Sequence, residues 1–412
     1  MNLTQYYALG IFILTYILLA FQGIPGIYLP RPAATLAGAV AMVAAGVVAL
    51  NDAYRLVDLN TIVFLLGMMI IVAYLQVSGF FQLVERRILS RARTRRQFLG
   101  WLIASSGILS ALFMNDAVCV MLTPVVLLFC ERASLRPAPY LIALATSSNI
   151  GSAFTPMGNP QNMLIAVHSG IPFTRFVFAL APCALGGLAL NYLFISRLYR
   201  EELSLPLRQE PLPPEDRPKS RLIYVCLGAT VLLLAMLAVN MSPAFAAISV
   251  ATLLIVAGST KPREALKEID WQLLLMFAAL FVVMGGLRQA GLMEKLTASA
   301  AGAAARWPEG KLWLLGGIST VLSNLASNVP AVMLLSNTVD ALGGGTSLWL
   351  CLAVTSTVAG NLTIIGSVAN LIVFETAREK VRIGFMEYFY AGAPVGIFLI
   401  IASCLWLGIL KP

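Results

Sequence analysis

The same polar pattern occurs twice in this chain, about 210 residues apart, and each copy interrupts a long apolar stretch. The first copy covers residues 110–116 and 147–162, and the second covers residues 323–330 and 359–370. Both copies are rich in Asn, Ser, Gly and Pro. Such interruptions at matching places in two hydrophobic halves predict a duplicated membrane protein whose interruptions meet around a solute site.

The composition supports a membrane environment. Hydrophobic residues make up 59% of the 412 residues and charged residues 11%, against about 25% charged in typical soluble domains. We find no cleavable signal peptide, because no basic region precedes the apolar residues 6–20. The net charge of +9 is explained by basic cytoplasmic loops, so a nucleic-acid partner is not expected. The single His168 excludes multi-histidine metal sites.

Apolar runs of roughly 20 residues, the length that crosses a bilayer, predict uninterrupted helices at 6–22, 34–50, 61–79, 176–196, 221–239, 243–258, 271–287 and 387–409. Regions 98–130 and 311–343 have polar centres without a charged loop, which predicts two re-entrant hairpins. Regions 139–168 and 347–375 are predicted spans with a broken centre, since non-helical backbone at that depth requires protein or water around it. The predicted fold is an all-α polytopic membrane protein with about ten full spans.

The order of these segments divides the chain into an N-terminal repeat (1–199), a cytoplasmic linker (200–220) and a C-terminal repeat (221–412). Each repeat crosses the membrane five times, so the second repeat must be inverted. If the basic run 86–96 lies inside, 21 of the 28 Lys and Arg residues are cytoplasmic and 7 are outside. This asymmetry follows the positive-inside rule and predicts a multi-pass protein of the cell (inner) membrane.

The hairpin tips are candidate ion sites. Ser110 and Asn115 recur as Ser323 and Asn328 with the same spacing of five. Half-helices that meet at a tip leave backbone groups without partners, and oxygen ligands of this kind suit a hard cation such as sodium. A second interpretation is that these side chains only cap broken helices.

The candidate ion- and substrate-binding residues are the small polar residues and one glycine of the interruptions: Ser110, Asn115, Asp116, Asn149, Gly151, Ser152, Thr155, Asn159, Asn162, Ser323, Ser327, Asn328, Asn361, Thr363, Ser367 and Asn370. Asp116 is the one acid that the topology places deep in the membrane, where a carboxylate is costly and therefore suggests a function. It could carry a proton, bind a cation, or cap the helix that follows it. The second tip has Val329 at this position.

No enzyme motif occurs, and there is no Walker-type nucleotide loop. The driving force is therefore expected from an ion gradient or from a separate ATPase subunit. No cofactor is predicted beyond bound sodium or coupled protons.

These segments resemble the ion transporter superfamily, which includes arsenite permeases, NhaD-type sodium/proton antiporters, citrate transporters and divalent-anion/sodium symporters. Residues 113–116 and 285–291 look like the arsenite permease branch, and residues 155–162 are similar to the citrate-transporter-like group. Residues 326–328 look like a symporter tip, with Val329 in place of Thr.

The resemblance implies one cation site at Ser110 and Asn115 with the backbone of 149–152. It implies a second at Ser323 and Asn328 with the backbone of 359–361. It also implies a dimerising scaffold and a transport domain that moves as an elevator.

We therefore predict an ion-coupled secondary transporter for a small anion or an arsenite-like metalloid, acting with a coupling ion in the lipid bilayer as a homodimer. A sodium/proton antiporter that uses Asp116 and a channel are the alternative predictions.

Overall fold

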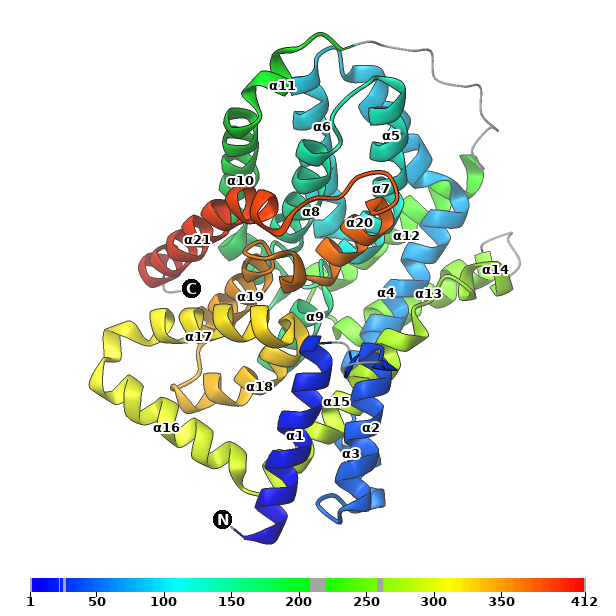
Figure 1. Ribbon diagram of the computed structural model, residues 1–412. Coiled ribbons are helices and arrows are strands. Elements are labelled where there is room, and N and C mark those ends of the chain that lie inside the picture. The colour runs from blue at the N-terminus through cyan, green and yellow to red at the C-terminus, as the bar shows by residue number, and fades with distance from the viewer. Residues whose placement is uncertain (1, 22, 25–26, 208–219, 258–261, 411–412) are drawn as a thin grey trace.

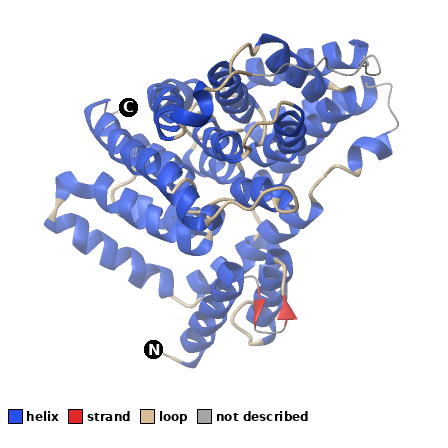
Figure 2. Cartoon of the chain, turned by 45° about the horizontal axis from the view of Figure 1, so that its top comes forward, coloured by secondary structure: helices blue, strands red, loops and turns tan. Residues whose placement is uncertain are grey.

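The computed structural model describes residues 2–21, 23–24, 27–207, 220–257 and 262–410, and these are almost entirely helical (Figures 1 and 2). The first half contains α1 (Leu3–Phe21), α2 (Arg31–Ala44), α3 (Leu50–Leu56), α4 (Leu59–Ser78), α5 (Phe80–Arg91), α6 (Arg95–Leu112), α7 (Asn115–Arg132), α8 (Ala138–Ser152), α9 (Pro160–Ser169), α10 (Phe173–Leu198) and α11 (Arg200–Ser204). Strands β1 (Gly23–Ile24) and β2 (Ile27–Tyr28) form a short antiparallel pair between α1 and α2.

The second half repeats this order. It contains α12 (Ser220–Ala238), α13 (Pro243–Ala257), α14 (Pro262–Leu266), α15 (Trp271–Gln289), α16 (Leu292–Arg306), the 3-10 turn η1 (Pro308–Gly310), α17 (Lys311–Ala326), α18 (Asn328–Ala341), α19 (Thr346–Ala359), the 3-10 turn η2 (Ile364–Gly366), α20 (Val368–Ala377) and α21 (Phe385–Leu410). Residues 208–219 of the predicted linker lie outside the described residues, and its first residues form α11.

Five helices of the described residues are long and apolar enough to cross a bilayer, namely α4, α10, α12, α15 and α21. The chain is thus a helical membrane protein with several spans, as predicted. The helix expected over 34–50 is shorter, because α2 ends at Ala44 and the chain turns at Gly46. Gly46 has φ of 68°, a conformation that glycine adopts without the strain of a side chain.

Both regions predicted as hairpins are pairs of packed helices, α6 with α7 and α17 with α18. Both regions predicted as broken spans are two helices separated by irregular backbone, α8 with α9 and α19 with α20. Local sequence explains the first break. Pro160 begins α9, where its missing N–H costs nothing, and the Asn159 side chain accepts the N–H of Asn162 at 2.8 Å as an N-cap.

Equivalent helices of the two halves pack in a crossed pattern. Helix α4 packs on α13, and its counterpart α15 packs on α2; likewise α7 packs on α20 and α18 on α9. Small residues permit the contacts of α4 with α13 and of α15 with α2. A Cβ on Gly67 of α4 would lie 2.7 Å from the backbone of Ala247 in α13, and one on Gly286 of α15 would lie 2.8 Å from Met42 Sδ in α2. Segments from opposite halves therefore build each layer, as Figure 1 shows for α2 beside α15.

Candidate functional site

The tip of the first hairpin closes on the break between α8 and α9. The backbone N–H of Asn115, the first residue of α7, donates to the carbonyl of Gly158 at 2.9 Å. The Thr155 hydroxyl donates to the carbonyl of Ala111. A Cβ on Gly158 would lie 2.2 Å from the carbonyl oxygen of Ser152, so this close approach requires glycine.

Oxygen atoms gather just behind this tip. The buried hydroxyls of Ser110 and Ser148 lie 2.9 Å apart, and the Ser148 hydroxyl also lies within 3.2 Å of the Asn115 carbonyl, to which it can donate. Gly151 allows α6 and α8 to lie this close, because a Cβ added at this position would lie 2.1 Å from the carbonyl oxygen of Gly107. The hairpin and the broken helix thus form one packed unit around polar atoms.

Asn149 joins the two halves of the chain. Its Oδ1 accepts from Asn115 Nδ2 at 3.2 Å and from Ser367 Oγ at 2.9 Å. Its Nδ2 donates to Asn361 Oδ1 at 2.9 Å and to Asn370 Oδ1 at 3.1 Å. All five side chains are buried, so this amide cluster connects the first hairpin tip with the second broken helix.

Thr357 occupies the equivalent position in the second half, 208 residues after Asn149. Its Oγ1 accepts from Asn159 Nδ2 at 3.2 Å and from Gln161 Nε2 at 3.1 Å, and it lies 3.5 Å from Asn162 Oδ1. Each half therefore places one polar residue between the broken-helix residues of the other half.

The two broken helices are also stabilised in the same way. Asn162 and Asn370 each donate from Nδ2 to the backbone carbonyls ten and seven residues earlier in the chain. Asn159 Nδ2 contacts both the carbonyl and the hydroxyl of Ser152 at 3.1 Å. These bonds satisfy the carbonyls that the helix break leaves free.

The second hairpin tip has a different backbone. Ser327 adopts a φ of 80° between α17 and α18. With its nitrogen directed inward, the Asn328 amide donates to the carbonyls of Ser356 at 2.9 Å and Gly366 at 3.1 Å. Thr363, in the break between α19 and α20, donates to Asn324 Oδ1 of α17 at 2.8 Å. This hydrogen bond joins the second broken helix to the second hairpin.

Two buried side-chain oxygens in these clusters have no hydrogen-bond partner among the described residues: Asn115 Oδ1 and Ser323 Oγ. They belong to opposite hairpins. Buried polar atoms in native proteins are almost always paired, and an unpaired oxygen has lone pairs available for a cation. Among the described residues no group of three His, Cys, Asp or Glu side chains could hold a metal ion. The site therefore offers neutral oxygens, which suit a weakly held monovalent cation.

The structure brings most of the predicted site residues together, with two exceptions. Asp116 is the second residue of α7 and is half-buried; the N-cap of α7 is Met114, so the prediction that Asp116 caps this helix is wrong. Its electrostatic neighbours are Arg31 of α2 and Asp270 at the start of α15 rather than the amide cluster. The half-buried Ser327 shapes the tip through its backbone. Sequence reasoning missed Ser148, Gln161, Asn324 and Thr357. Aligning the halves by position rather than by residue type would have found Thr357.

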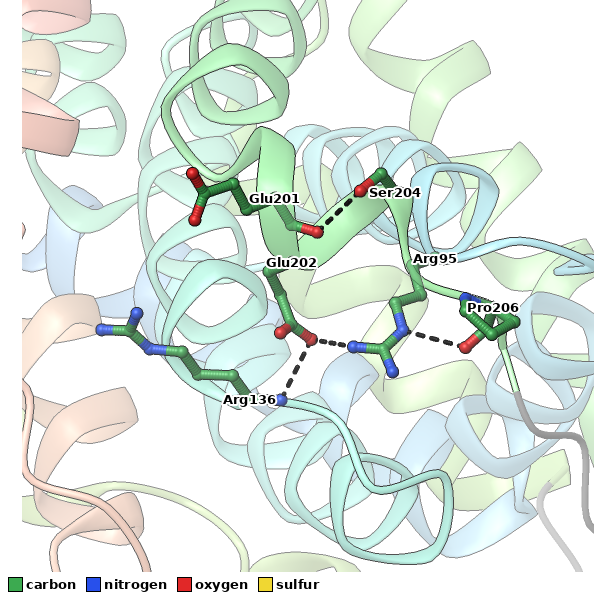
Figure 3. A network of polar contacts seen from close by, with 6 residues as sticks. All are labelled: Arg95, Arg136, Glu201, Glu202, Ser204 and Pro206. Carbon is green, nitrogen blue, oxygen red and sulfur yellow. Dashed lines mark hydrogen bonds and ion pairs between the residues drawn. The ribbon is translucent and has the colours of Figure 1, made fainter.

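A second polar cluster lies at the opposite end of α6 (Figure 3). The buried Arg95 pairs with Glu202 of α11 and donates from Nε to the carbonyl of Pro206 at 3.2 Å. Glu202 also accepts the backbone N–H of Arg136 at 3.3 Å, and Arg136 Nη2 donates to Glu387 Oε1 at 2.7 Å. The cluster ties the bases of α6, α8 and α21 to the start of the linker.

Close by, Lys380 donates to Glu131 at the exposed end of α7. This hydrogen bond lowers the pKa of the Glu131 carboxyl below its ordinary value. Charged groups thus gather at the helix bases, whereas the tips hold neutral amides and hydroxyls together with the single acid Asp116 of the first tip.

Comparisons with known proteins agree with this architecture. Residues 16–349 match the family model described as citrate transporter. The silicon efflux transporter LSI3 of Oryza sativa subsp. japonica is 32% identical over 450 residues, covering 91% of this chain and 90% of that protein. The inner membrane protein YbiR of Escherichia coli (strain K12) is 29% identical over 335 residues, covering 81% and 84%. The crystal structure of the Alcanivorax borkumensis YdaH transporter has a TM-score of 0.63 at 14% identity, covering 99% and 97% of the two chains. At that identity the likeness concerns the fold.

Proposed function

The chain belongs to the citrate transporter family, and on this premise we propose that it is an ion-coupled secondary transporter that moves a small anion or an arsenite-like oxyanion by elevator-type alternating access. As a member of a transporter family it is a multi-pass membrane protein and not an enzyme. The coupling ion, the mechanism and the site residues are the proposed part.

The proposal depends on one observation above all, the two unpaired buried oxygens Asn115 Oδ1 and Ser323 Oγ in the hairpin clusters. Asn115 lies in the amide cluster that links the two halves, and Ser323 lies on α17 one turn before the second hairpin tip at Ser327. We assign sodium to these clusters, with Ser110 and Asn115 as ligands in the first and Ser323 and Asn328 in the second. The remaining ligands are backbone carbonyls freed by the helix breaks.

The crossed packing supports inverted repeats with about ten spans and two re-entrant hairpins. Helix α4 corresponds to α15, and α2 corresponds to α13, so the contacts α4–α13 and α15–α2 are the same contact made once from each half. This is expected if the halves are related by an axis in the membrane plane. The hairpins and broken helices then form the transport domain, and α1, α2, α4, α12, α13 and α15 form the scaffold. We propose that the scaffold dimerises and that a separate ATPase subunit is not required.

The substrate class follows from the site and from the relatives. One relative is named a silicon efflux transporter, and the family model is named for citrate. Citrate is a small anion that carries several carboxylate oxygens. The tips also place the positive N-termini of α7 and α18 near the clusters, which suits such a solute.

Uptake into proteoliposomes tests the proposal. Purified protein is reconstituted, and uptake of citrate, sulfate, a dicarboxylate and arsenite is measured under a sodium gradient, a proton gradient or neither. Saturable uptake of at least one solute that depends on an ion gradient is expected. Solute flux that neither saturates nor responds to any gradient would indicate a channel and overturn the carrier mechanism.

A sodium/proton antiporter is the second candidate. The observation that favours it is the position of Asp116, which lies on the transport hairpin but faces Arg31 and Asp270 of the scaffold. A carboxylate at a sliding interface could exchange a proton for sodium. Sodium flux driven by a pH gradient in the absence of any anion would support this candidate.

A further inference from the structure

A polar cavity of about 210 Å³ lies between the scaffold and the second hairpin, and none of the tip-cluster residues lines it. Five elements line it, namely α3, the N-cap of α4, α9, α15 and α18, and its polar residues include Arg55, Asp58, His168, Arg288, Ser336 and Asn337. Its volume is below the roughly 300–1,000 Å³ of pockets for drug-sized ligands. It therefore suits a small solute or ion.

The packing of α3 on α15 brings two arginines to this cavity. A Cβ on Gly285 would lie 2.4 Å from the Leu56 side chain, so the glycine lets α3 lie directly on α15. Arg55 precedes Leu56, and Arg288 lies one turn after Gly285 on the same face of α15. Neither guanidinium makes an ion pair or hydrogen bond with a described residue, and both line the same space.

Asp58 is the one carboxylate among the described residues that line the cavity, and it is already engaged. Asp58 caps α4 by accepting the N–H of Asn60 at 3.0 Å and the hydroxyl of Thr61 at 2.6 Å. The His168 ring lies 3.8 Å from this carboxylate. The lining thus carries two unpaired positive charges and a single negative charge that a helix N-terminus already stabilises, which leaves it net positive.

The other half of the chain shows that the fold does not require this charge. The offset of 212 residues that aligns Gly79 with Gly291 places Gln76 opposite Arg288. Gln76 is neutral and donates to Glu268 at 2.8 Å. The positive charge at position 288 is therefore a local property of this cavity.

We propose that the Arg55–Arg288 cavity binds a small multivalent anion on the outer face of the protein, between the scaffold and the second hairpin. The cavity leads toward the tips, because Leu164 is two residues from Asn162 on α9, and Met333 is five residues, about 7.5 Å of helix, from Asn328 on α18. That the bound anion is then transported rests on the proposed function, whereas its binding in the cavity does not. The inference names the substrate class as anionic rather than neutral.

Labelling of a cysteine in the cavity tests this directly. Asn337 is changed to cysteine in a Cys183→Ser background, since the other five native cysteines are buried. The rates of modification by an anionic and by a cationic methanethiosulfonate are compared by mass spectrometry. The double variant Arg55→Gln/Arg288→Gln should lower the anionic-to-cationic rate ratio roughly tenfold at low ionic strength, for charges on the order of 8 Å away.

Inorganic sulfate is the second probe. It should slow modification in the parent and not in the double variant, while Arg288→Lys should retain protection. Arg175→Gln is the matched control, because Arg175 is exposed, is predicted to lie on the same face and does not line the cavity. An unchanged rate ratio together with unchanged sulfate protection in the double variant would overturn the inference. Protection without any uptake in liposomes would instead refute the transport proposal and leave the anion site standing.

Discussion

Replacing Gly151 with alanine should separate the two helices that hold the first hairpin cluster. The new Cβ would lie 2.1 Å from the carbonyl oxygen of Gly107 and 2.5 Å from its Cα. Backbone atoms cannot rotate away as a side chain can, so α6 and α8 must move apart by more than 1 Å to restore ordinary contact near 3.4 Å. Two pairs of serine hydroxyls bridge these helices, Ser106 with Ser147 at 2.6 Å and Ser110 with Ser148 at 2.9 Å. Both would exceed hydrogen-bonding distance.

The expected loss of stability follows from these contacts. Two lost hydrogen bonds contribute about 1 kcal/mol each, and overpacking a close interface costs about 1–3 kcal/mol. The total is about 3–5 kcal/mol, and with it Tm should fall by on the order of 10 °C. Thermal unfolding in detergent can be followed with a thiol-reactive fluorophore, because five of the six cysteines are buried and become exposed on unfolding.

Gly186→Ala provides the matched control. Gly186 also lies inside a helix, but a Cβ added there would have no other atom within 4 Å outside its own helix backbone and chain neighbours. This variant should be neutral or more stable by about 0.5–1 kcal/mol, since alanine favours the helix. If Gly151→Ala and Gly186→Ala unfold at the same temperature, the close contact between α6 and α8 is wrong.

Three further predictions concern the residues at the hairpin tips and the charged cluster around Arg95. Asn115→Ala and Asn328→Ala should each reduce uptake per folded protein at limiting ion concentration about tenfold or more. Both should also lower Tm, because each variant loses buried hydrogen bonds, one from Asn115 to Asn149 and two from the Asn328 amide, and each group left unpaired costs about 1–3 kcal/mol. Normal uptake per folded protein by both variants would remove them from the ion site. Asp116→Asn should abolish the pH dependence of uptake between about pH 5.5 and 8.5 if this residue carries a proton; an unchanged pH profile would show that it carries none. Glu202→Gln should destabilise the protein by about 2 kcal/mol, because it leaves the buried Arg95 without its ion pair. Glu201→Gln should not change stability, since Glu201 is exposed and turned away from Arg95 in Figure 3. Equal Tm values for these two variants would contradict the role of the ion pair.

The positions of the paired and broken helices could be predicted from the sequence, because each helix is an apolar run that ends at charged or polar residues. The region 98–130 corresponds to α6 and α7, and the region 347–375 corresponds to α19 through α20. The end of α2 was not predictable from hydropathy, because residues 45–48 are as apolar as the helix before them. The turn there depends on the backbone of Gly46.

Within the site, residues that recur by type were identified from the sequence, and residues that recur only by position were not. Asn115 and Asn328 are identical, so their match is visible. Asn149 and Thr357 differ in chemistry although they occupy equivalent places between the halves. The unpaired oxygens could not be predicted at all, because hydrogen-bond satisfaction is a property of the packed structure.

The hydrogen bonds across the halves bear on which parts can move. Asn149 ties the first half to Asn361 and Asn370, and Thr357 ties the second half to Asn159. Moving one repeat against the other would break all of these buried bonds at once, at roughly 1–3 kcal/mol for each group left unpaired. The scaffold contacts α4–α13 and α2–α15 join the halves in the same way. We infer that each moving body contains segments from both repeats. In the elevator mechanism that we propose, sliding would then occur between the scaffold and the hairpin bodies, along the seam that holds the Arg55–Arg288 cavity.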